Sequence, residues 1–311
     1  MHQILWLASA HARLCLMAGL AAGLLLPGLA RVMVPWLPHM VAALLTITAL
    51  CIGHRAAVGA ARDMRWGLAA VAVLQLAVPL VLLFVLSMFG LQNTPAALAT
   101  VLASAAPAIT GSVNLALILR LDGGRMMQIL VLGTAAFPIT ILPILAALPQ
   151  LGPAPDVIFS AIKLLVVILI STAIGFCLRA WIFPRPTDGQ VRALDGASIL
   201  AFSFIVVGLM AALNPALRSD PWAVAKWAML AFTISYALQA LTLITLRRTA
   251  LHPVAGPLAI GAGNRNIALF LVTLPAEVLA PLMVFIGCWQ LPMYLTPILL
   301  PRLYAKALRN D

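Results

Sequence analysis

Long apolar segments recur along nearly the whole of this 311-residue chain, and they restrict its fold more than any other feature. Hydrophobic residues make up 64% of the chain and charged residues only 9%, whereas a soluble domain is about 25% charged. Because lipid offers the backbone no hydrogen bonds, a segment that crosses it must satisfy its own backbone, as a helix does. The composition therefore predicts an all-α polytopic membrane protein.

Hydropathy divides the chain into ten candidate spans, of the kind that needs about twenty apolar residues to cross a bilayer. They lie near Leu14–Leu29, His39–Ile52, Gly67–Phe89, Pro95–Leu119, Met126–Leu148, Val157–Phe183, Val191–Leu213, Trp222–Leu246, Pro253–Leu274 and Ala276–Leu299. The alternative for the first segment is a signal peptide, but its apolar run is long and many more spans follow it.

The loop charges support ten spans, because cytoplasmic loops are enriched in Lys and Arg. With a cytoplasmic N-terminus, that side collects fourteen of the nineteen cations: Arg13, Arg55, Arg62, Arg65, Arg120, Arg125, Arg179, Arg185, Arg192, Arg247, Arg248, Arg302, Lys306 and Arg309. We therefore expect a multi-pass protein of the inner (plasma) membrane with both termini in the cytoplasm. The stretch Arg55–Arg65 is expected to form a short surface helix or loop. Cations scattered singly between apolar runs argue against a nucleic-acid partner.

A turn-rich link, Pro149–Asp156, divides the chain into residues 1–150 and 157–311, with five predicted spans in each part. Two related halves with an odd number of spans must be inverted relative to each other, as in many secondary transporters. The fourth span of each half is interrupted, by Pro107–Asn114 and by Gly261–Asn266. The sequence therefore predicts two inverted five-helix repeats with matched broken helices, the fourth and the ninth.

The second interruption places a permanent charge, two amides and two glycines inside an apolar run. A charged side chain at bilayer depth costs at least a few kcal/mol and marks a functional site by default. Half-helix ends and freed carbonyls can together bind an ionic solute. Two alternatives stay open: the breaks are kinks that serve packing alone, or Arg265 snorkels or pairs with helix-end carbonyls.

The order of segments, the proline and small-residue break in the fourth span and the Gly-x-x-Asn of the ninth resemble the bile acid:sodium symporter family. The resemblance covers nearly the whole chain, although the motifs are only partly kept. It implies ten helices in two inverted repeats, arranged as a panel and a core domain, with broken helices that cross near the membrane centre. It also implies alternating-access transport of a small organic anion.

Residue by residue, Pro107 and Ser112 match the fourth-span motif of the family, and Gly263 and Asn266 match that of the ninth. Gln75 stands where the family has a sodium-contacting glutamine. The candidate substrate-binding residues are Thr110, Ser112, Asn114, Asn264, Arg265 and Asn266, and the candidate remnants of an ion site are Gln75, Ser112 and Gly263. Ser235 and Gln239 share one helix face, where they either line a pathway or form hydrogen bonds between helices.

The chain departs from the family where sodium would bind. Gly261 replaces an acidic residue, Arg265 replaces a glutamine, and Met126 and Leu130 stand where hydroxyl-bearing ligands are expected. All eight carboxylates fall in loops or at span ends, so neither sodium nor proton coupling has an obvious chemical carrier. We expect no cofactor and no metal, with sodium as the alternative. The hypothesis is that the Arg265 guanidinium takes the electrostatic role of sodium and attracts the anion.

Other functional classes fit the residues less well. An enzyme within the membrane would need a nucleophile with its base, a metal cluster or paired carboxylates there, and the spans contain none of these, so we expect no enzyme. A sensor without transport usually carries a soluble output domain, and the loops here are short. Arsenite exporters are expected to have a fourth-span cysteine, which Pro107–Asn114 lacks. The alternatives that remain are an auxin-efflux-type carrier, with ten spans and crossed breaks, another ten-helix anion carrier, or a membrane sensor without transport.

Overall fold

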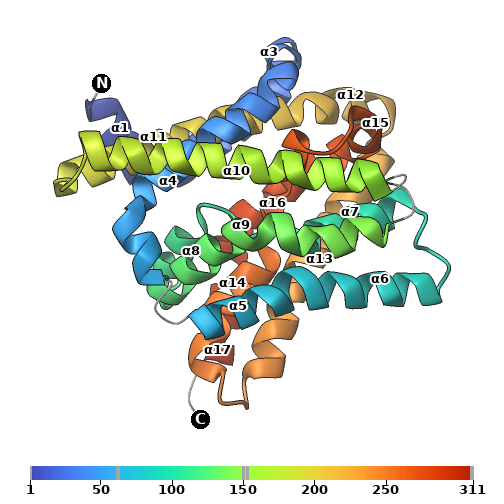
Figure 1. Ribbon diagram of the computed structural model, residues 1–311. Helices are drawn as coiled ribbons and strands as arrows, with labels where there is room; N and C mark the ends of the chain where they lie inside the picture. The colour runs from blue at the N-terminus through green and yellow to red at the C-terminus, as the bar shows by residue number, and fades with distance from the viewer. Residues whose placement is uncertain (1, 61–63, 149–150, 152–153, 309–311) are drawn as a thin grey trace. The chain divides into compact units, whose positions relative to one another are not determined.

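The computed structural model describes residues 2–60, 64–148, 151 and 154–308, and this part of the chain is helical without a β-strand (Figure 1). Seven of its helices are long and apolar enough to cross a membrane: Pro27–Gly53, Met64–Met88, Gly123–Ala146, Ile158–Ile182, Asp188–Ser219, Pro221–Leu246 and Ala276–Leu299. The prediction of an all-α polytopic membrane protein is confirmed at this level.

Each of the seven helices coincides with one of the ten predicted spans. The first predicted span falls on α2 (Ala12–Leu25), which is sharply bent against α1 (His2–Ala10). The fourth and ninth predicted spans are interrupted and form no continuous helix of membrane-crossing length. The count of ten and the inverted repeats therefore stay predictions.

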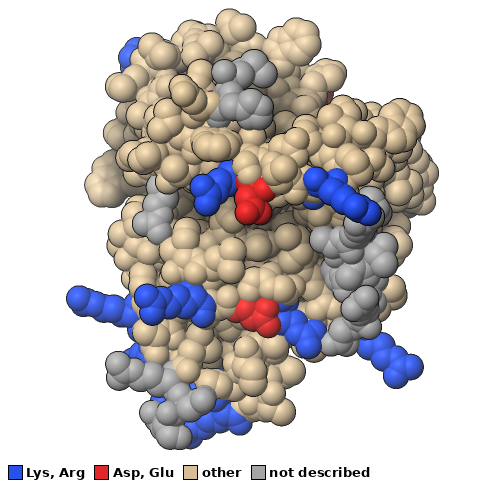
Figure 2. All heavy atoms as spheres, turned by 90° about the vertical axis from the view of Figure 1, so that its left-hand side faces the viewer, with Lys and Arg blue, Asp and Glu red and all other residues tan. Residues whose placement is uncertain are grey.

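The surface also has the character expected of a protein in lipid. Many large apolar side chains are exposed. Trp181, for example, has 82% of its surface exposed and Phe84 has 64%. A soluble monomer rarely exposes wide apolar patches. On the face drawn in Figure 2, the red Asp and Glu side chains lie beside blue Lys or Arg side chains, and uncharged residues cover most of the remaining surface.

The chain folds as two compact units. Unit 1 comprises Met1–Val58, Lys163–Ala225 and Ala268–Gly287, and unit 2 comprises Gly59–Ile162, Lys226–Ile267 and Cys288–Asp311. Each unit therefore contains segments that precede and segments that follow the link Pro149–Asp156 in the sequence. Residues 149, 150, 152 and 153 of that link lie outside the described residues.

In unit 1, α11 packs along α1, α2 and α3. Gly19 and Gly23 of α2 allow this approach, because a Cβ on Gly19 would lie 2.6 Å from the Ser203 carbonyl oxygen and one on Gly23 2.8 Å from that of Val207. Most of unit 1 consists of α1 and α2 with α3 (Pro27–Met33), η1 (Val34–Trp36), α4 (Leu37–Ala60), α10 (Ala154–Ile182), α11 (Asp188–Leu209), η5 (Met210–Ala212), α12 (Leu213–Ser219), η7 (Ile267–Val272), α15 (Ala276–Leu279) and η8 (Ala280–Leu282).

The basic stretch Arg55–Arg65 follows a kink in α4. Gly53 has φ 73° and ψ 153°, values outside the helical region, and a short helical stretch then runs to Ala60. A positive φ of this kind suits glycine because it has no Cβ. Residues 61–63, including Arg62, lie outside the described residues.

Unit 2 contains the interrupted segments. In Figure 1 its helices α5 and α6 continue one another through η3, a short π-helix, as one rod from Met64 to Met88. The elements of unit 2 are α5 (Met64–Ala72), η3 (Val73–Ala77), α6 (Val78–Met88), α7 (Pro95–Ala105), α8 (Ser112–Ile118), α9 (Gly123–Ala146), most of α13 (Pro221–Leu246), η6 (His252–Val254), α14 (Ala255–Gly263), most of α16 (Met283–Leu299) and α17 (Pro301–Ala307).

Helix caps explain why some carboxylates lie at span ends. The Asp122 Oδ1 accepts a hydrogen bond of 2.9 Å from the Arg125 backbone N–H at the start of α9. The Asp220 Oδ1 accepts one of 2.9 Å from the Ala223 N–H at the start of α13. A carboxylate in this position satisfies a free N–H and the positive end of the helix dipole.

Candidate functional site

Unit 2 breaks two helices near the middle of their predicted spans. Helix α7 ends at Ala105 and α8 begins at Ser112, while α14 ends at Gly263 and η7 begins at Ile267. The first break has a local cause, because Ala106 precedes a proline and takes extended angles of φ −59° and ψ 151°. Both breaks free backbone groups that lipid could not satisfy.

The two breaks lie side by side and satisfy part of each other's backbone. The Ile109 N–H donates to the Asn264 carbonyl at 2.9 Å, and the Asn266 N–H donates to the Pro107 carbonyl at 2.8 Å. Together these bonds form an antiparallel bridge between Ala108 and Arg265. The two interruptions singled out in the sequence therefore form one structural site.

The Arg265 guanidinium binds three backbone carbonyls around this bridge. Its Nε donates to Ala262 at 2.9 Å, its Nη1 to Ala106 at 2.9 Å and its Nη2 to Leu74 at 2.8 Å. The side chain is almost completely buried, with 1% of its surface exposed. No described carboxylate forms an ion pair with it. Arg265 thus pairs with helix-end carbonyls, which was one of the open alternatives.

Each of these carbonyls belongs to an irregular place in a helix. Ala262 lies in the last turn of α14, Ala106 caps the end of α7, and Leu74 lies in the π-helix η3. The carboxyl end of a helix has several carbonyls without a partner in the helix and carries partial negative charge. The guanidinium therefore stands where two half-helix dipoles both favour a cation.

Side chains from other helices of unit 2 form a second set of contacts with the α14 break. The Trp289 Nε1 donates to the Arg265 carbonyl at 3.0 Å, and the Ser235 Oγ donates to the Gly263 carbonyl at 2.8 Å. The Thr296 Oγ1 lies 3.3 Å from the Asn264 Oδ1 and within hydrogen-bonding reach of it. The break is therefore held by side chains of α13 and α16 as well as by the bridge.

Gln239 connects these side chains to α17. Its Nε2 lies 3.3 Å from the Ser235 Oγ and 3.4 Å from the Thr296 Oγ1, and its Oε1 accepts a hydrogen bond of 2.8 Å from the Tyr304 hydroxyl. Burial raises the pKa of the Tyr304 phenol, which is protonated and donates this hydrogen bond. Ser235 and Gln239 are fully buried and link helices, which was the second interpretation of their shared face.

The candidate residues of the first break differ in their exposure. Ser112 is fully buried, and within the described part of the chain its Oγ has no hydrogen-bond partner. Thr110 is half-buried and Asn114 is exposed. From the second break, Asn266 is 7% exposed and contacts the first break through its backbone. Thr110 and Ser112 belong to the junction of the break with α8, whereas Asn114 lies half a turn into α8.

Among the residues considered for an ion site, Gln75 has a hydrogen-bond partner and Gly261 has apolar neighbours. The Gln75 Oε1 accepts a hydrogen bond of 3.0 Å from Thr140. A Cβ on Gly261 would meet Ile129 Cγ2 at 3.2 Å and Leu74 Cδ1 at 3.4 Å. The described residues contain no group of three or more His, Cys, Asp or Glu placed to hold a metal ion. Gly261, which stands where the family has an acidic residue, therefore has hydrocarbon side chains rather than oxygen ligands beside it.

Sequence reasoning missed several residues that build this site, namely Leu74, Trp289, Thr296 and Tyr304. Leu74 acts through its carbonyl, which side-chain identity does not reveal. A hydroxyl or indole in an apolar run is an available signal, because such groups find partners when buried. No protein-family model and no curated protein matches the chain.

Proposed function

We propose that this protein is a secondary transporter of organic anions, resembling the bile acid:sodium symporters, with alternating access around its two broken helices. Its site cation is the Arg265 side chain, which takes the place that sodium has in such carriers. The observation that carries the proposal is the buried guanidinium bound to three carbonyls at helix irregularities, without a carboxylate partner among the described residues.

The electrostatics of the site favour an anion as ligand. The guanidinium brings a full positive charge into a segment of membrane depth, and its three acceptors are neutral carbonyls. Charges interact strongly where water is excluded, so an anion beside the breaks would be stabilised. Three N–H groups of Arg265 already donate to carbonyls. The side chain therefore acts on the anion mainly through the electrostatic field of its positive charge and through its remaining N–H groups.

The hydrogen bonds to the anion would come from neighbouring residues. The buried Ser112 hydroxyl has no partner within the described part of the chain, and a buried polar group of this kind costs about 1–3 kcal/mol until it is bonded. The Asn266 amide at the other break is a second donor. Thr110, Asn114 and Asn264 complete the proposed substrate-binding set.

The order in which chain segments alternate between the two units supports the proposed inverted repeats. Along the chain, Met1–Val58 of unit 1 is followed by Gly59–Ile162 of unit 2, and then Lys163–Ala225 of unit 1 is followed by Lys226–Ile267 of unit 2. Apart from Ala268–Gly287 of unit 1, which interrupts the second stretch of unit 2, the same order thus occurs twice, as expected if unit 1 is the panel domain and unit 2 the core domain. We place the protein in the inner (plasma) membrane with both termini cytoplasmic.

Uptake measurements test this proposal. A thermal-shift screen of organic anions, with sodium or choline as the only cation, would select ligands, since a ligand that binds only the folded state raises its stability. Uptake of a radiolabelled hit into proteoliposomes is then expected, with less than about a twofold change when choline replaces sodium, because the required positive charge is covalently part of the chain.

Two outcomes would contradict the proposal. Uptake that collapses in choline would show that sodium, and not Arg265, is the site cation. Ligands that stabilise the protein without any flux would favour a membrane sensor over a carrier.

A further inference from the structure

A surface pocket of about 530 Å³ lies between the first helix and the start of α11 in unit 1. Five of its lining residues, Gln3, Trp6, Leu7, Ser9 and Ala10, belong to α1, and the sixth is Arg192 of α11. Its walls are mostly apolar and its single cation is Arg192. None of these residues belongs to the anion site proposed above.

The Trp6 ring is a fixed wall of this pocket. Its Nε1 donates to the Gly189 carbonyl at 3.0 Å, which ties α1 to the first turn of α11. The indole is nevertheless 47% exposed, so its apolar surface remains open to a ligand. Trp residues are enriched at the membrane interface, where an apolar ring and a polar N–H are both satisfied.

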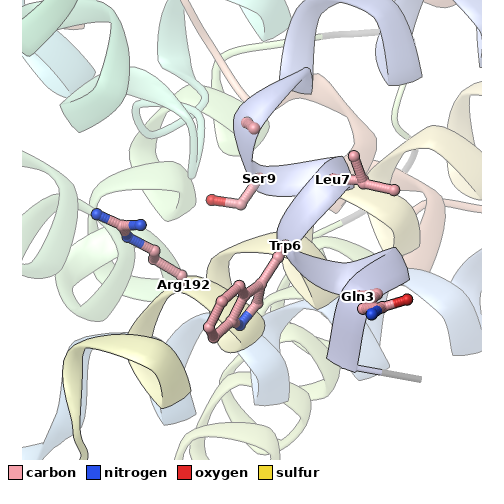
Figure 3. A pocket seen from close by; sticks show the side chains of 6 residues that line it. Gln3, Trp6, Leu7, Ser9 and Arg192 are labelled. Carbon is pink, nitrogen blue, oxygen red and sulfur yellow. The ribbon is translucent and has the colours of Figure 1, made fainter.

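Arg192 supplies the charge of the pocket. Its neighbours one turn away on α11 are Asp188 and Asp195, and neither forms an ion pair with it within the described residues. Figure 3 shows the Arg192 side chain and the Ser9 hydroxyl on the same side of α1, with the Trp6 ring beside them. A guanidinium and a hydroxyl are suitable donors for a phosphate.

We propose that this pocket binds an anionic phospholipid. The phosphate would accept hydrogen bonds from Arg192 and Ser9, and the glycerol and acyl carbons would lie against Trp6 and Leu7. The expected topology places Arg192 at the cytoplasmic end of its span, where basic pockets between membrane helices bind anionic head groups. This site does not depend on the function proposed for unit 2.

Native mass spectrometry of the detergent-purified full chain tests the site with phosphatidylglycerol and phosphatidylethanolamine. We expect phosphatidylglycerol to bind about tenfold more tightly than phosphatidylethanolamine, and Arg192→Gln to remove about that factor, which corresponds to about 1.4 kcal/mol. The matched control is Arg185→Gln, which removes an exposed arginine before the same helix and should change the affinity less than about twofold.

A photoactivatable phosphatidylglycerol on the unaltered chain provides a second measurement, which needs no folded variant. Cross-links should fall on α1 and the first turns of α11. Equal affinity for the two lipids, an Arg192→Gln variant that keeps its preference, or cross-links confined to other helices would overturn the proposal.

Discussion

At the scale of single residues, Arg265 shows how a membrane protein can keep an arginine in its interior without a carboxylate partner among the described residues. A hydrogen bond to a charged group contributes about 1.5–3 kcal/mol, and a charge at the centre of a spanning helix costs at least about 2.5–3.5 kcal/mol. Three such bonds, to Leu74, Ala106 and Ala262, therefore offset a substantial part of the cost of burying the guanidinium. The planar fork of arginine reaches all three acceptors at once, which the single ammonium of lysine does less well.

The Arg265→Gln variant should be markedly less stable than the parent protein. Each buried carbonyl left without a donor costs about 1–3 kcal/mol, and glutamine can replace only part of the fork, so we expect a loss of at least about 2 kcal/mol. The measurement is thermal unfolding of the purified protein in detergent, followed by tryptophan fluorescence. Sodium should raise the melting temperature of this variant but not of the parent, because the freed carbonyl oxygens suit a hard cation.

The control for this comparison is Arg302→Gln, which removes an exposed arginine of unit 2 and should leave the melting temperature almost unchanged. If the Arg265→Gln variant melts at the same temperature as this control, the three carbonyl contacts do not stabilise the breaks.

At the scale of helices, the two breaks are parts of one site but are packed very differently. The α14 break is enclosed by α13 and α16, and the Gly263 Cα lies against the Ser235 carbonyl and the Gln239 side chain. At the first break, Gly111 faces open space, with nothing within 4 Å of the place where a Cβ would lie. The α14 break is therefore packed at Gly263, while the first break is buried at Ala106–Ile109 and leaves room at Gly111.

Substitution of these two glycines by alanine should give opposite results. In Gly263→Ala the methyl group would collide with the Ser235 carbonyl and with Gln239, and we expect a destabilisation of about 1–3 kcal/mol. In Gly111→Ala, with φ −75° and free space, the change should stay within about 0.5 kcal/mol. Melting temperatures of the two variants, measured side by side, decide the point. Similar values would mean that α13 can move away from Gly263 at little cost.

At the scale of the whole molecule, the helices leave wide apolar surface exposed and keep most polar contacts inside each unit. Asn214 of unit 1, for example, donates through its Nδ2 to the Leu24 carbonyl at 2.6 Å, next to the bend between α2 and α3. Exposed residues such as Trp181 and Phe84 contribute apolar surface that only lipid would cover favourably. The membrane is thus the solvent for most of this surface.

The predicted topology can be tested by cysteine labelling of the full chain. In a background with the four native cysteines replaced by alanine, Gln150→Cys should react with a membrane-impermeant maleimide in intact spheroplasts. Arg302→Cys should react only after the membrane is permeabilised, because ten spans put the C-terminus in the cytoplasm. Labelling of Arg302→Cys in intact spheroplasts would indicate an odd number of spans or the opposite orientation.

The sequence by itself determined the class of the molecule and the positions of its irregularities. Continuous apolar runs predict membrane helices because burial in lipid depends on local composition, and the described part of the chain contains seven of these helices. The breaks at Pro107 and at Gly263–Asn266 were predictable because proline removes a donor and these polar residues interrupt an apolar run.

Only the tertiary structure decided what the Arg265 side chain binds. Its partners Ala106 and Leu74 lie 159 and 191 residues away in the chain, and both act through carbonyls that every residue carries. Tyr304, 65 residues from Gln239, could not be assigned to the site from its surroundings in the sequence. Hydropathy and residue type report local preference, whereas these contacts depend on which distant helix ends meet in the folded chain.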